Sequence, residues 1–260
     1  MGEDMVNYGT PLRGKVAVIT GGGQGVGFGV AEEFIAQGAQ VTITGLDADQ
    51  LTAAVNELGS EAIGIVADVR DEASMTEAYA EVVARFGHVD IVVANAVVGD
   101  SNPLGKITEA QFDNIFDTNV KGVLFTVQPA IPHMTDGGTV VIVSSTASVK
   151  AGEGMSLYGG AKAALRSMVR SWTLELRGTG IRVNVLTSGA VDTPSLRSAL
   201  AGAIGEDQVD ATVTSMGEGS PLGRLLQPRE IGTAIAFLAS EASSAVTGAE
   251  LFADGGLAQV

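Results

Sequence analysis

The chain contains no cysteine and only two histidines in its 260 residues. The lack of cysteine excludes disulfides, thiolate catalysis and cysteine-ligated metal. Both histidines, His88 and His133, flank helical patterns, where a structural role is the more common one. We therefore expect no metal cofactor, and we expect any catalysis to depend on hydroxyl, phenol, amine or carboxyl groups.

Basic residues are also scarce: 15 lysines and arginines stand against 30 acidic residues, for a formal net charge of −15. This balance disfavours nucleic acid and membrane partners, because phosphates and anionic lipids are bound by basic patches. A saline habitat and an ordinary solubilising surface both account for the excess of acid. No apolar run reaches the length of a membrane span, and residues 1–13 lack a signal pattern, so the expected location is the cytoplasm.

Glycine, in contrast, is plentiful, and short apolar runs alternate with helical patterns along the chain. Strands are predicted at Lys15–Thr20, Gln40–Thr44, Ala62–Ala67, Asp90–Ala94, Thr139–Val143, Ile181–Leu186 and Leu251–Ala253. Helices are predicted at Gly25–Gln37, Asp47–Leu58, Glu72–Phe86, Thr108–Met134, Tyr158–Arg177 and Pro228–Ser240. This alternation predicts an α/β fold: a single-domain, Rossmann-type, doubly wound parallel sheet of about seven strands, flanked by helices.

The domain is expected to span residues 1–260, because no linker, repeat or low-complexity tract divides the chain. One segment departs from the regular alternation. Residues 193–222 are rich in Ala, Gly, Ser and Thr, which predicts a mobile insert of small helices that acts as a substrate lid.

A glycine-rich turn follows the first strand and opens the first helix, with the sequence Thr20-Gly21-Gly22-Gly23-Gln24-Gly25-Val26-Gly27. In this context Gly21 permits a tight turn, Gly25 lets the backbone approach a pyrophosphate, and Gly27 allows the helix to pack closely on the sheet. The helix N-terminus presents free N–H groups to phosphate. The turn therefore predicts a dinucleotide site.

A second group of polar residues follows the fifth predicted strand. Ser145 lies at the strand's carboxyl end, and Tyr158 and Lys162 lie four residues apart on one face of a helix. A free phenol has a pKa of about 10, and a neighbouring ammonium is expected to lower it. Such a phenol can exchange a proton with a carbonyl or alcohol oxygen, while the serine hydroxyl stabilises the charge that develops there.

These motifs together resemble the short-chain dehydrogenase/reductase family. The resemblance rests on Thr20-Gly21-x-x-x-Gly25-x-Gly27 and on Ser145 placed thirteen residues before the Tyr158-x-x-x-Lys162 motif, and it extends over most of the chain. It implies an NAD(P)-dependent oxidoreductase acting on CH–OH donors. It also implies a catalytic set of Asn119, Ser145, Tyr158 and Lys162.

The resemblance assigns roles to further residues. Asp68 would bind the edge of the adenine ring, Asn95 would brace the sheet beside the adenosine, and Thr193 would bond the nicotinamide carboxamide. The implied cofactor-binding set is Gly21, Gln24, Gly25, Val26, Gly27, Leu46, Asp47, Asp68, Val69, Asn95, Tyr158, Lys162, Gly189, Val191 and Thr193.

The residues after the second strand favour NAD(H) over NADP(H). Relatives that use NADP usually carry a basic residue at the positions of Leu46 or Gln24, and both positions are uncharged here. Asp47 would also repel a 2′-phosphate. Gly45, however, occupies the position where relatives that use NAD usually carry an acid, so NADP(H) stays open.

The substrate is predicted only as a class, a secondary alcohol or ketone. Candidate walls of its pocket are Val97, Val149, Leu157, Leu196, Leu200 and Met216, while Arg197 and Lys150 are either anion contacts or solvated surface.

Three other functions remain open: reduction of a 3-oxoacyl thioester, lyase or dehalogenase chemistry, and nucleotide binding without turnover. The complete glycine turn and catalytic set oppose the last two. The resemblance also implies a homotetramer, with interfaces formed by the helices at 108–134 and 158–177.

Overall fold

The computed structural model describes residues 10–135 and 137–260. Residues 1–9, most of the stretch expected to lack a signal pattern, lie outside the described part. Among the described residues, no helix is long and apolar enough to cross a membrane. The same ranges contain no cluster of three or more His, Asp or Glu residues suited to hold a metal ion.

Seven parallel strands form one sheet in the order β3-β2-β1-β4-β5-β6-β7, which confirms the predicted fold class. The strands are β1 Val16–Thr20, β2 Gln40–Gly45, β3 Ala62–Val66, β4 Ile91–Ala94, β5 Gly138–Ser145, β6 Ile181–Ser188 and β7 Glu250–Ala253. The chain runs outward from β1 to β3 and then crosses back to place β4 beside β1. This reversal is the topological switch point, where doubly wound sheets bind their ligands.

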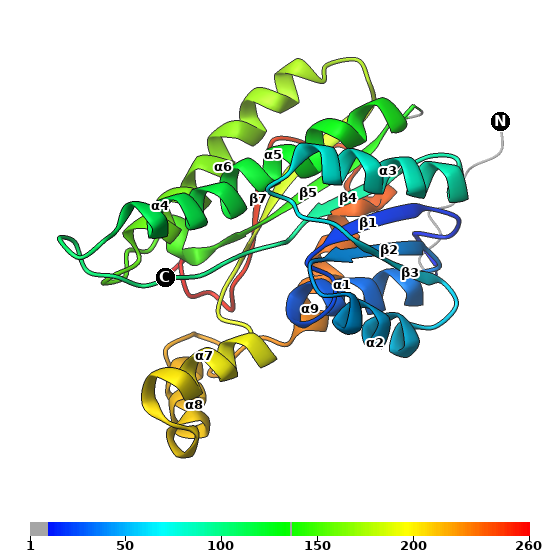
Figure 1. Ribbon diagram of the computed structural model, residues 1–260. Helices are drawn as coiled ribbons and strands as arrows, with labels where there is room; N and C mark the ends of the chain where they lie inside the picture. The colour runs from blue at the N-terminus through cyan, green and yellow to red at the C-terminus, as the bar shows by residue number, and fades with distance from the viewer. Residues whose placement is uncertain (1–9, 136) are drawn as a thin grey trace.

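Helices cover both faces of the sheet (Figure 1). Helices α1 (Gly25–Ala36), α2 (Ala48–Leu58) and α9 (Pro228–Ala239) pack on one face, and α3 (Glu72–Phe86), α5 (Gly122–Val127) and α6 (Ser156–Glu175) pack on the other. Successive residues of a strand point to opposite faces of the sheet. The residues of each strand therefore alternate between two hydrophobic cores, one on each face.

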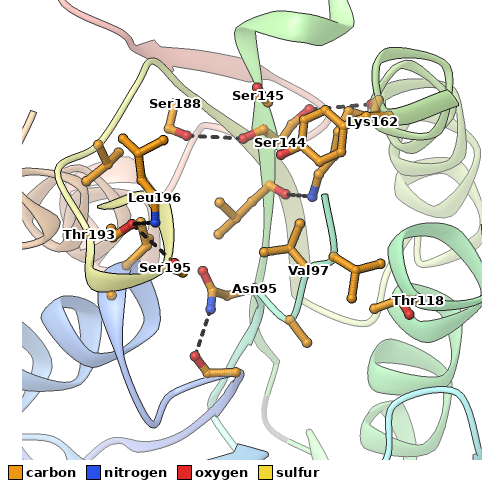
Figure 2. A pocket seen from close by; sticks show the side chains of 18 of the residues that line it. Asn95, Val97, Thr118, Ser144, Ser145, Lys162, Ser188, Thr193, Ser195 and Leu196 are labelled. Atoms are coloured by element: carbon orange, nitrogen blue, oxygen red, sulfur yellow. Dashed lines mark hydrogen bonds between the residues drawn. The ribbon is translucent and has the colours of Figure 1, made fainter. Parts of the chain in front are cut away.

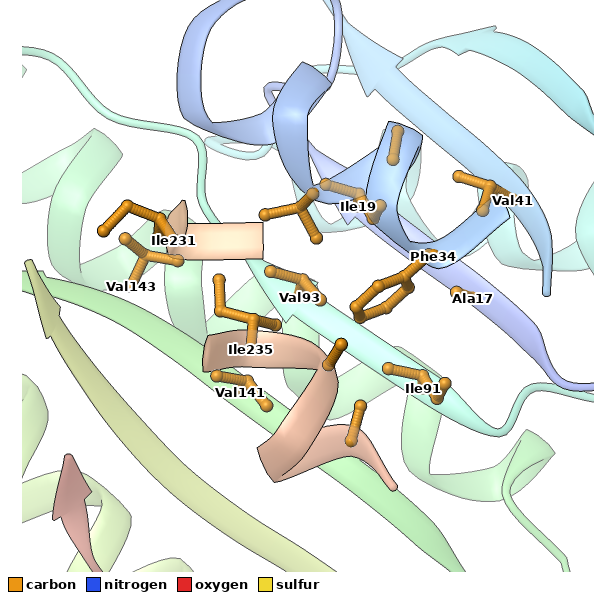
Figure 3. Close-up of a cluster of buried hydrophobic side chains, with 14 of the residues drawn as sticks. Ala17, Ile19, Phe34, Val41, Ile91, Val93, Val141, Val143, Ile231 and Ile235 are labelled. Carbon is orange, nitrogen blue, oxygen red and sulfur yellow. The ribbon is translucent and has the colours of Figure 1, made fainter. Parts of the chain in front are cut away.

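The first core shows this alternation directly (Figure 3). Ala17 and Ile19 of β1 pack with Phe34 of α1 and Ile235 of α9, and all four are fully or almost fully buried. Their strand neighbours, such as Val18, join the second core on the other face. Burial on both faces explains why the central strands consist almost entirely of valine, isoleucine and alanine.

The long helix expected between Thr108 and Met134 is present from Glu109 to His133, but it is not a uniform α-helix, because the segment is divided into four pieces. Thr108 does form the expected N-terminal cap, and its hydroxyl accepts a hydrogen bond from the backbone N–H of Gln111 at 3.3 Å. The pieces are α4 Glu109–Phe116, a π-helical turn Asp117–Lys121, α5, and a 3-10 helix Gln128–His133. Two prolines in the 3-10 helix lack the N–H that a continuing α-helix needs. Asn119 lies in the π-helical turn.

The lid segment contains the small helices expected of it. They are α7 (Pro194–Ile204), a 3-10 turn (Glu206–Gln208) and α8 (Val209–Glu218), and Figure 1 shows them projecting from the body of the domain, in yellow. Arg197 of α7 joins the loop after β6 to α8, because its guanidinium donates to Asp192 at 2.6 and 2.9 Å and to Asp210 at 2.8 Å. Arg197 is thus engaged by two carboxylates, which argues against the role of anion contact.

Candidate functional site

A cavity of about 1010 Å³ lies at the carboxyl ends of the strands. Its walls come from the turns after β1, β2, β4, β5 and β6 and from the lid. It extends from Asp68, after β3, to Met216 of α8. Figure 2 shows Ser145 and Lys162 on one wall of this cavity and Thr193 and Leu196 on the opposite wall.

The glycine turn forms the floor of one end of the cavity. Gly21 and Gly25 have φ values of +65° and +58°, in the left-handed region that side chains disfavour. A Cβ atom on Gly27 would collide with the carbonyl oxygen of Gly21, so this position admits only glycine at the observed spacing. Gly27 itself does not line the cavity but brings α1 against the turn.

Asn95, at the end of β4, fixes this turn. Its side-chain amide donates to the carbonyl oxygens of Thr20 at 2.9 Å and Gly21 at 3.1 Å. Its backbone N–H donates in turn to the Thr20 hydroxyl at 3.1 Å. The two strands at the switch point are therefore joined by the Asn95 side chain, which also holds the turn in shape.

The start of α1 is suited to an anion. The N-cap residue, Gln24, makes no side-chain capping hydrogen bond, so the first N–H groups of the helix point outward without a side-chain partner from the cap. Gly25 and Val26 line the cavity at this point. A helix N-terminus without a side-chain cap can bind a diphosphate through its free N–H groups. The glycines before it have no side chains to block the diphosphate.

Most residues predicted to bind a cofactor lie along the cavity. Those lining it are Gly21, Gln24, Gly25, Val26, Leu46, Asp47, Asp68, Val69, Asn95, Tyr158, Lys162, Gly189, Val191 and Thr193. Thr193 caps α7, where its hydroxyl accepts from the backbone N–H of Leu196 at 3.2 Å.

The acidic residues at the far end of the cavity have partners of their own. The Asp47 carboxylate caps α2, accepting from the N–H groups of Asp49 and Gln50 at 3.0 Å each. Asp68 forms a forked ion pair with Arg70, whose Nη2 lies 2.8 Å from Oδ2. Hydrogen bonds from the Arg70 side chain hold the pKa of Asp68 below its ordinary value.

The strand end and the helix start bring Ser145, Tyr158 and Lys162 to the same end of the cavity. Ser145 closes β5 and its hydroxyl accepts from the backbone N–H of Ala147 at 3.2 Å. Lys162 is almost fully buried, and its ammonium donates to the carbonyl of Val143 at 2.9 Å (Figure 2). The same nitrogen lies 5.8 Å from the centroid of the Tyr158 ring.

The expectation that the ammonium lowers the phenol pKa is wrong for the protein as the structure describes it. Burial raises the pKa of Tyr158 above 10, and a hydrogen bond with the Ser145 side chain only partly opposes this. Burial also lowers the pKa of Lys162 to about 8. Both shifts have one cause, because a dry environment disfavours the charged form of each group. The phenol is therefore protonated at neutral pH.

Asn119 does not line the cavity. It is fully buried in the π-turn, and its amide pairs with the backbone of Val98, donating to the carbonyl at 2.8 Å and accepting from the N–H at 3.1 Å. The extra residue of a π-turn shifts the side chains that follow it, and such turns are frequent at functional sites. Here the turn lets Asn119 hold the loop after β4, whose Val97 and Val98 face the cavity.

The substrate wall was predicted only in part. Val97, Leu196 and Met216 line the cavity, but Val149, Leu157 and Leu200 do not. Adjacent helical residues point about 100° apart, so Leu157 cannot share the face of Tyr158. Val149 is 45% exposed beyond the short turn after β5, and Leu200 lies one turn further along α7 than Leu196.

Several lining residues were not anticipated from the sequence. Thr118, Ala147, Met155, Ser195 and Leu257 all contribute to the wall. Ser195 directly precedes Leu196 in the first turn of α7, and helical spacing does not predict that both line the cavity. No sequence signal places Leu257, which reaches the cavity from the C-terminal turn.

Comparisons with known proteins agree with this geometry. Residues 21–258 match the family described as enoyl-(acyl carrier protein) reductase. The chain is 41% identical over 251 residues to Oxidoreductase asL5 of Sarocladium schorii, covering 96% of this chain and 98% of that protein. It is 34% identical to hydroxynaphthalene reductase arp2 of Aspergillus fumigatus, covering 94% of this chain and 93% of that protein. The ligand-free aldohexose dehydrogenase of Thermoplasma acidophilum superposes with a TM-score of 0.89 at 25% identity, over 96% of each chain.

Proposed function

The chain belongs to the short-chain dehydrogenase/reductase family of oxidoreductases, and we propose that it transfers a hydride between NAD(H) and a secondary alcohol or ketone, with Tyr158 as general acid/base. The observation that carries this proposal is the shared cavity. The glycine turn of β1 and the Ser145, Tyr158 and Lys162 side chains open into one continuous space, so a bound dinucleotide and a reacting oxygen can meet there.

The family and the dehydrogenase neighbour imply a nicotinamide cofactor. The residues present fit one, because the uncapped start of α1 and the bare glycine backbone form a cradle that a Cβ atom would fill. Gly21, Gly25 and Val26 would hold its diphosphate, and Thr193 would hold the carboxamide. When bound, the cofactor supplies or accepts the hydride at the substrate carbon.

Protein side chains handle the proton. In ketone reduction the Tyr158 phenol donates its proton to the substrate oxygen, and the Ser145 hydroxyl stabilises the charge on that oxygen until the proton arrives. Lys162 would bind the cofactor beside the phenol, and its ammonium does not bring the phenol pKa below the ordinary value. Because the phenol is protonated at neutral pH, we propose that reduction is the faster direction there and that alcohol oxidation needs alkaline solution.

The NAD(H) preference is proposed from the charges at the far end of the cavity. A 2′-phosphate carries charge that a nearby cation must balance, and the one cation lining this end in the described part of the chain, Arg70, is already paired with Asp68. Asp47 would add repulsion. A Cβ at Gly45 would meet Leu51 at 3.6 Å, which is an ordinary contact, so Gly45 is not required by packing.

The substrate is proposed as a ketone or secondary alcohol with a bulky apolar part. Val97, Met155, Leu196 and Met216 give the reacting end of the cavity an apolar wall. The similarity to a hydroxynaphthalene reductase supports a substrate of this kind. A 3-oxoacyl thioester is a second candidate, which the matched reductase family favours and the net charge of −15 disfavours for docking to an acidic carrier. We also propose that the protein is cytoplasmic and forms a homotetramer.

A screen of ketones and secondary alcohols with NADH, NADPH and their oxidised forms tests the proposal. The panel includes cyclic and aromatic ketones, a sugar and a 3-oxoacyl thioester, and absorbance of the reduced nicotinamide reports turnover. We expect higher catalytic efficiency with NADH than with NADPH and the fastest turnover with a bulky ketone. Faster turnover with NADPH would overturn the cofactor assignment, and no turnover with any pair would overturn the proposed activity.

A further inference from the structure

The cavity has few charged side chains in its walls, and all but one have an evident role. The charged lining residues are Asp47, Asp68, Arg70, Lys150 and Lys162. The first three lie at the far end, where they cap a helix or pair with each other. Lys162 is buried beside Tyr158. Lys150 is therefore the one charged residue at the reacting end whose role is unassigned.

Lys150 lies close to the proposed chemistry along the chain. It follows Ser145 by five residues, and its backbone N–H donates to the carbonyl of Thr146 at 2.8 Å, which fixes it to the turn after β5. Lining residues around it, such as Ala151 and Met155, are apolar. Lys150 is itself exposed to solvent, so its ammonium is free of water only once a bound molecule covers it.

The ammonium of Lys150 has one protein partner, which is uncharged. Its Nζ donates to the backbone carbonyl of Leu257 at 3.1 Å, and no carboxylate lies within ion-pair distance in the part of the chain that the structure describes. An ammonium has three N–H donors, so it keeps donors for a ligand while it makes this bond.

Leu257, which accepts the hydrogen bond from Lys150, lies in a C-terminal turn that is held by hydrogen bonds. The Asp254 carboxylate is almost fully buried and accepts from the N–H groups of Gly256 at 2.9 Å and Ala258 at 2.8 Å, which closes a turn around Leu257. Gly256 packs on Pro221 at the end of the lid. Lys150 is thus held between the turn after β5 and the C-terminal turn, at a set position in the cavity wall.

We propose that Lys150 is a specificity-determining residue that binds a carboxylate on the substrate, away from the carbonyl that is reduced. This inference rests on the proposed hydride transfer and narrows its substrate class to keto acids with an apolar body. The reacting oxygen would lie between Ser145 and Tyr158, and the carboxylate would lie at Lys150. A charge-assisted hydrogen bond that the substrate shields from water contributes about 1.5–3 kcal/mol, which corresponds to roughly 10- to 150-fold in affinity.

Matched substrates test the proposal. Aromatic and alicyclic keto acids are compared with their methyl esters in the wild type, Lys150→Met and Lys150→Arg, with kcat and KM measured separately. We expect the wild type to prefer the acids, and we expect Lys150→Met to raise KM for the acids by at least about tenfold while changing KM for the esters less than about threefold. Lys150→Arg should restore most of the preference, and added salt should raise KM for the acids alone.

The contrary outcomes are distinct. Equal losses for acid and ester in Lys150→Met would mean that Lys150 only tethers the C-terminal turn. Equal efficiency for acid and ester in the wild type would overturn the carboxylate role while leaving the proposed activity in place. No reduction of either compound, or of any ketone in the wider screen, would overturn the proposed activity itself.

Discussion

We predict that replacing the buried Lys162 by methionine raises the free energy of unfolding of the protein and abolishes its activity. Lys162 is almost fully buried, and burial lowers its pKa from 10.5 to about 8. The folded protein therefore disfavours the ammonium relative to the unfolded chain, and this cost is present at pH 7. Lys162→Met removes the charge and keeps a similar volume in the core.

The expected magnitude follows from the two pKa values. At pH 7 the lowered pKa costs about 3 kcal/mol of folding free energy, and at pH 10 about 1 kcal/mol, because the unfolded chain also loses its proton as pH approaches 10.5. The hydrogen bond from the ammonium to the Val143 carbonyl is lost in the variant, at a cost of about 1 kcal/mol. Lys162→Met should therefore gain about 2 kcal/mol at pH 7 and almost nothing at pH 10.

Urea unfolding at both pH values measures this difference, with Lys121→Met as the matched control. The Lys121 side chain is 41% exposed and pairs with Asp117 one helical turn away at 2.7 Å, so the same substitution there should change stability by less than about 0.5 kcal/mol at either pH. A loss of stability in Lys162→Met at pH 7 would refute the reasoning. So would a gain that is the same at pH 7 and pH 10, because it would not come from the buried charge.

Four further outcomes are expected. Gly27→Ala should lower the melting temperature by several degrees and abolish NADH binding, because its Cβ collides with the glycine-turn backbone; thermal scans and fluorescence titration measure both. Leu46→Arg should raise the NADPH to NADH efficiency ratio at least about tenfold, since it adds a cation beside the ribose. Asn119→Ala should cost about 2–4 kcal/mol of stability in urea, because it removes both hydrogen bonds to Val98. Ketone reduction should slow and alcohol oxidation accelerate as pH rises toward the raised pKa of Tyr158, and initial rates in both directions would stay unchanged above pH 7 if the phenolate were already present there.

Local patterns were enough to predict the sheet and most helices. The continuous apolar runs of β1, β4 and β5 identify buried strands, because a strand covered on both faces has no polar alternation. Thr108 predicts a helix start correctly because its cap is formed by residues only three positions away. The placement of Ser145, Tyr158 and Lys162 in one cavity was also predictable, since a strand end and the first turn of a helix hold them.

The features that were missed depend on contacts between distant segments. The π-turn around Asn119 forms because that side chain pairs with Val98, 21 residues away, and no local propensity encodes it. The contact between Lys150 and Leu257 spans 107 residues and depends on how the C-terminal turn packs on the lid. The raised pKa of Tyr158 likewise depends on burial, which the sequence spacing alone does not report.

The measurement that tests the central claim most directly is a comparison of NADH binding and ketone reduction in Tyr158→Phe. The substitution removes only the phenolic oxygen, so the fold and the glycine turn stay intact. We predict that NADH binds within about threefold of the wild-type affinity, measured by fluorescence titration, while turnover falls by at least about a hundredfold. Near-normal turnover in Tyr158→Phe, with NADH binding retained, would contradict the account.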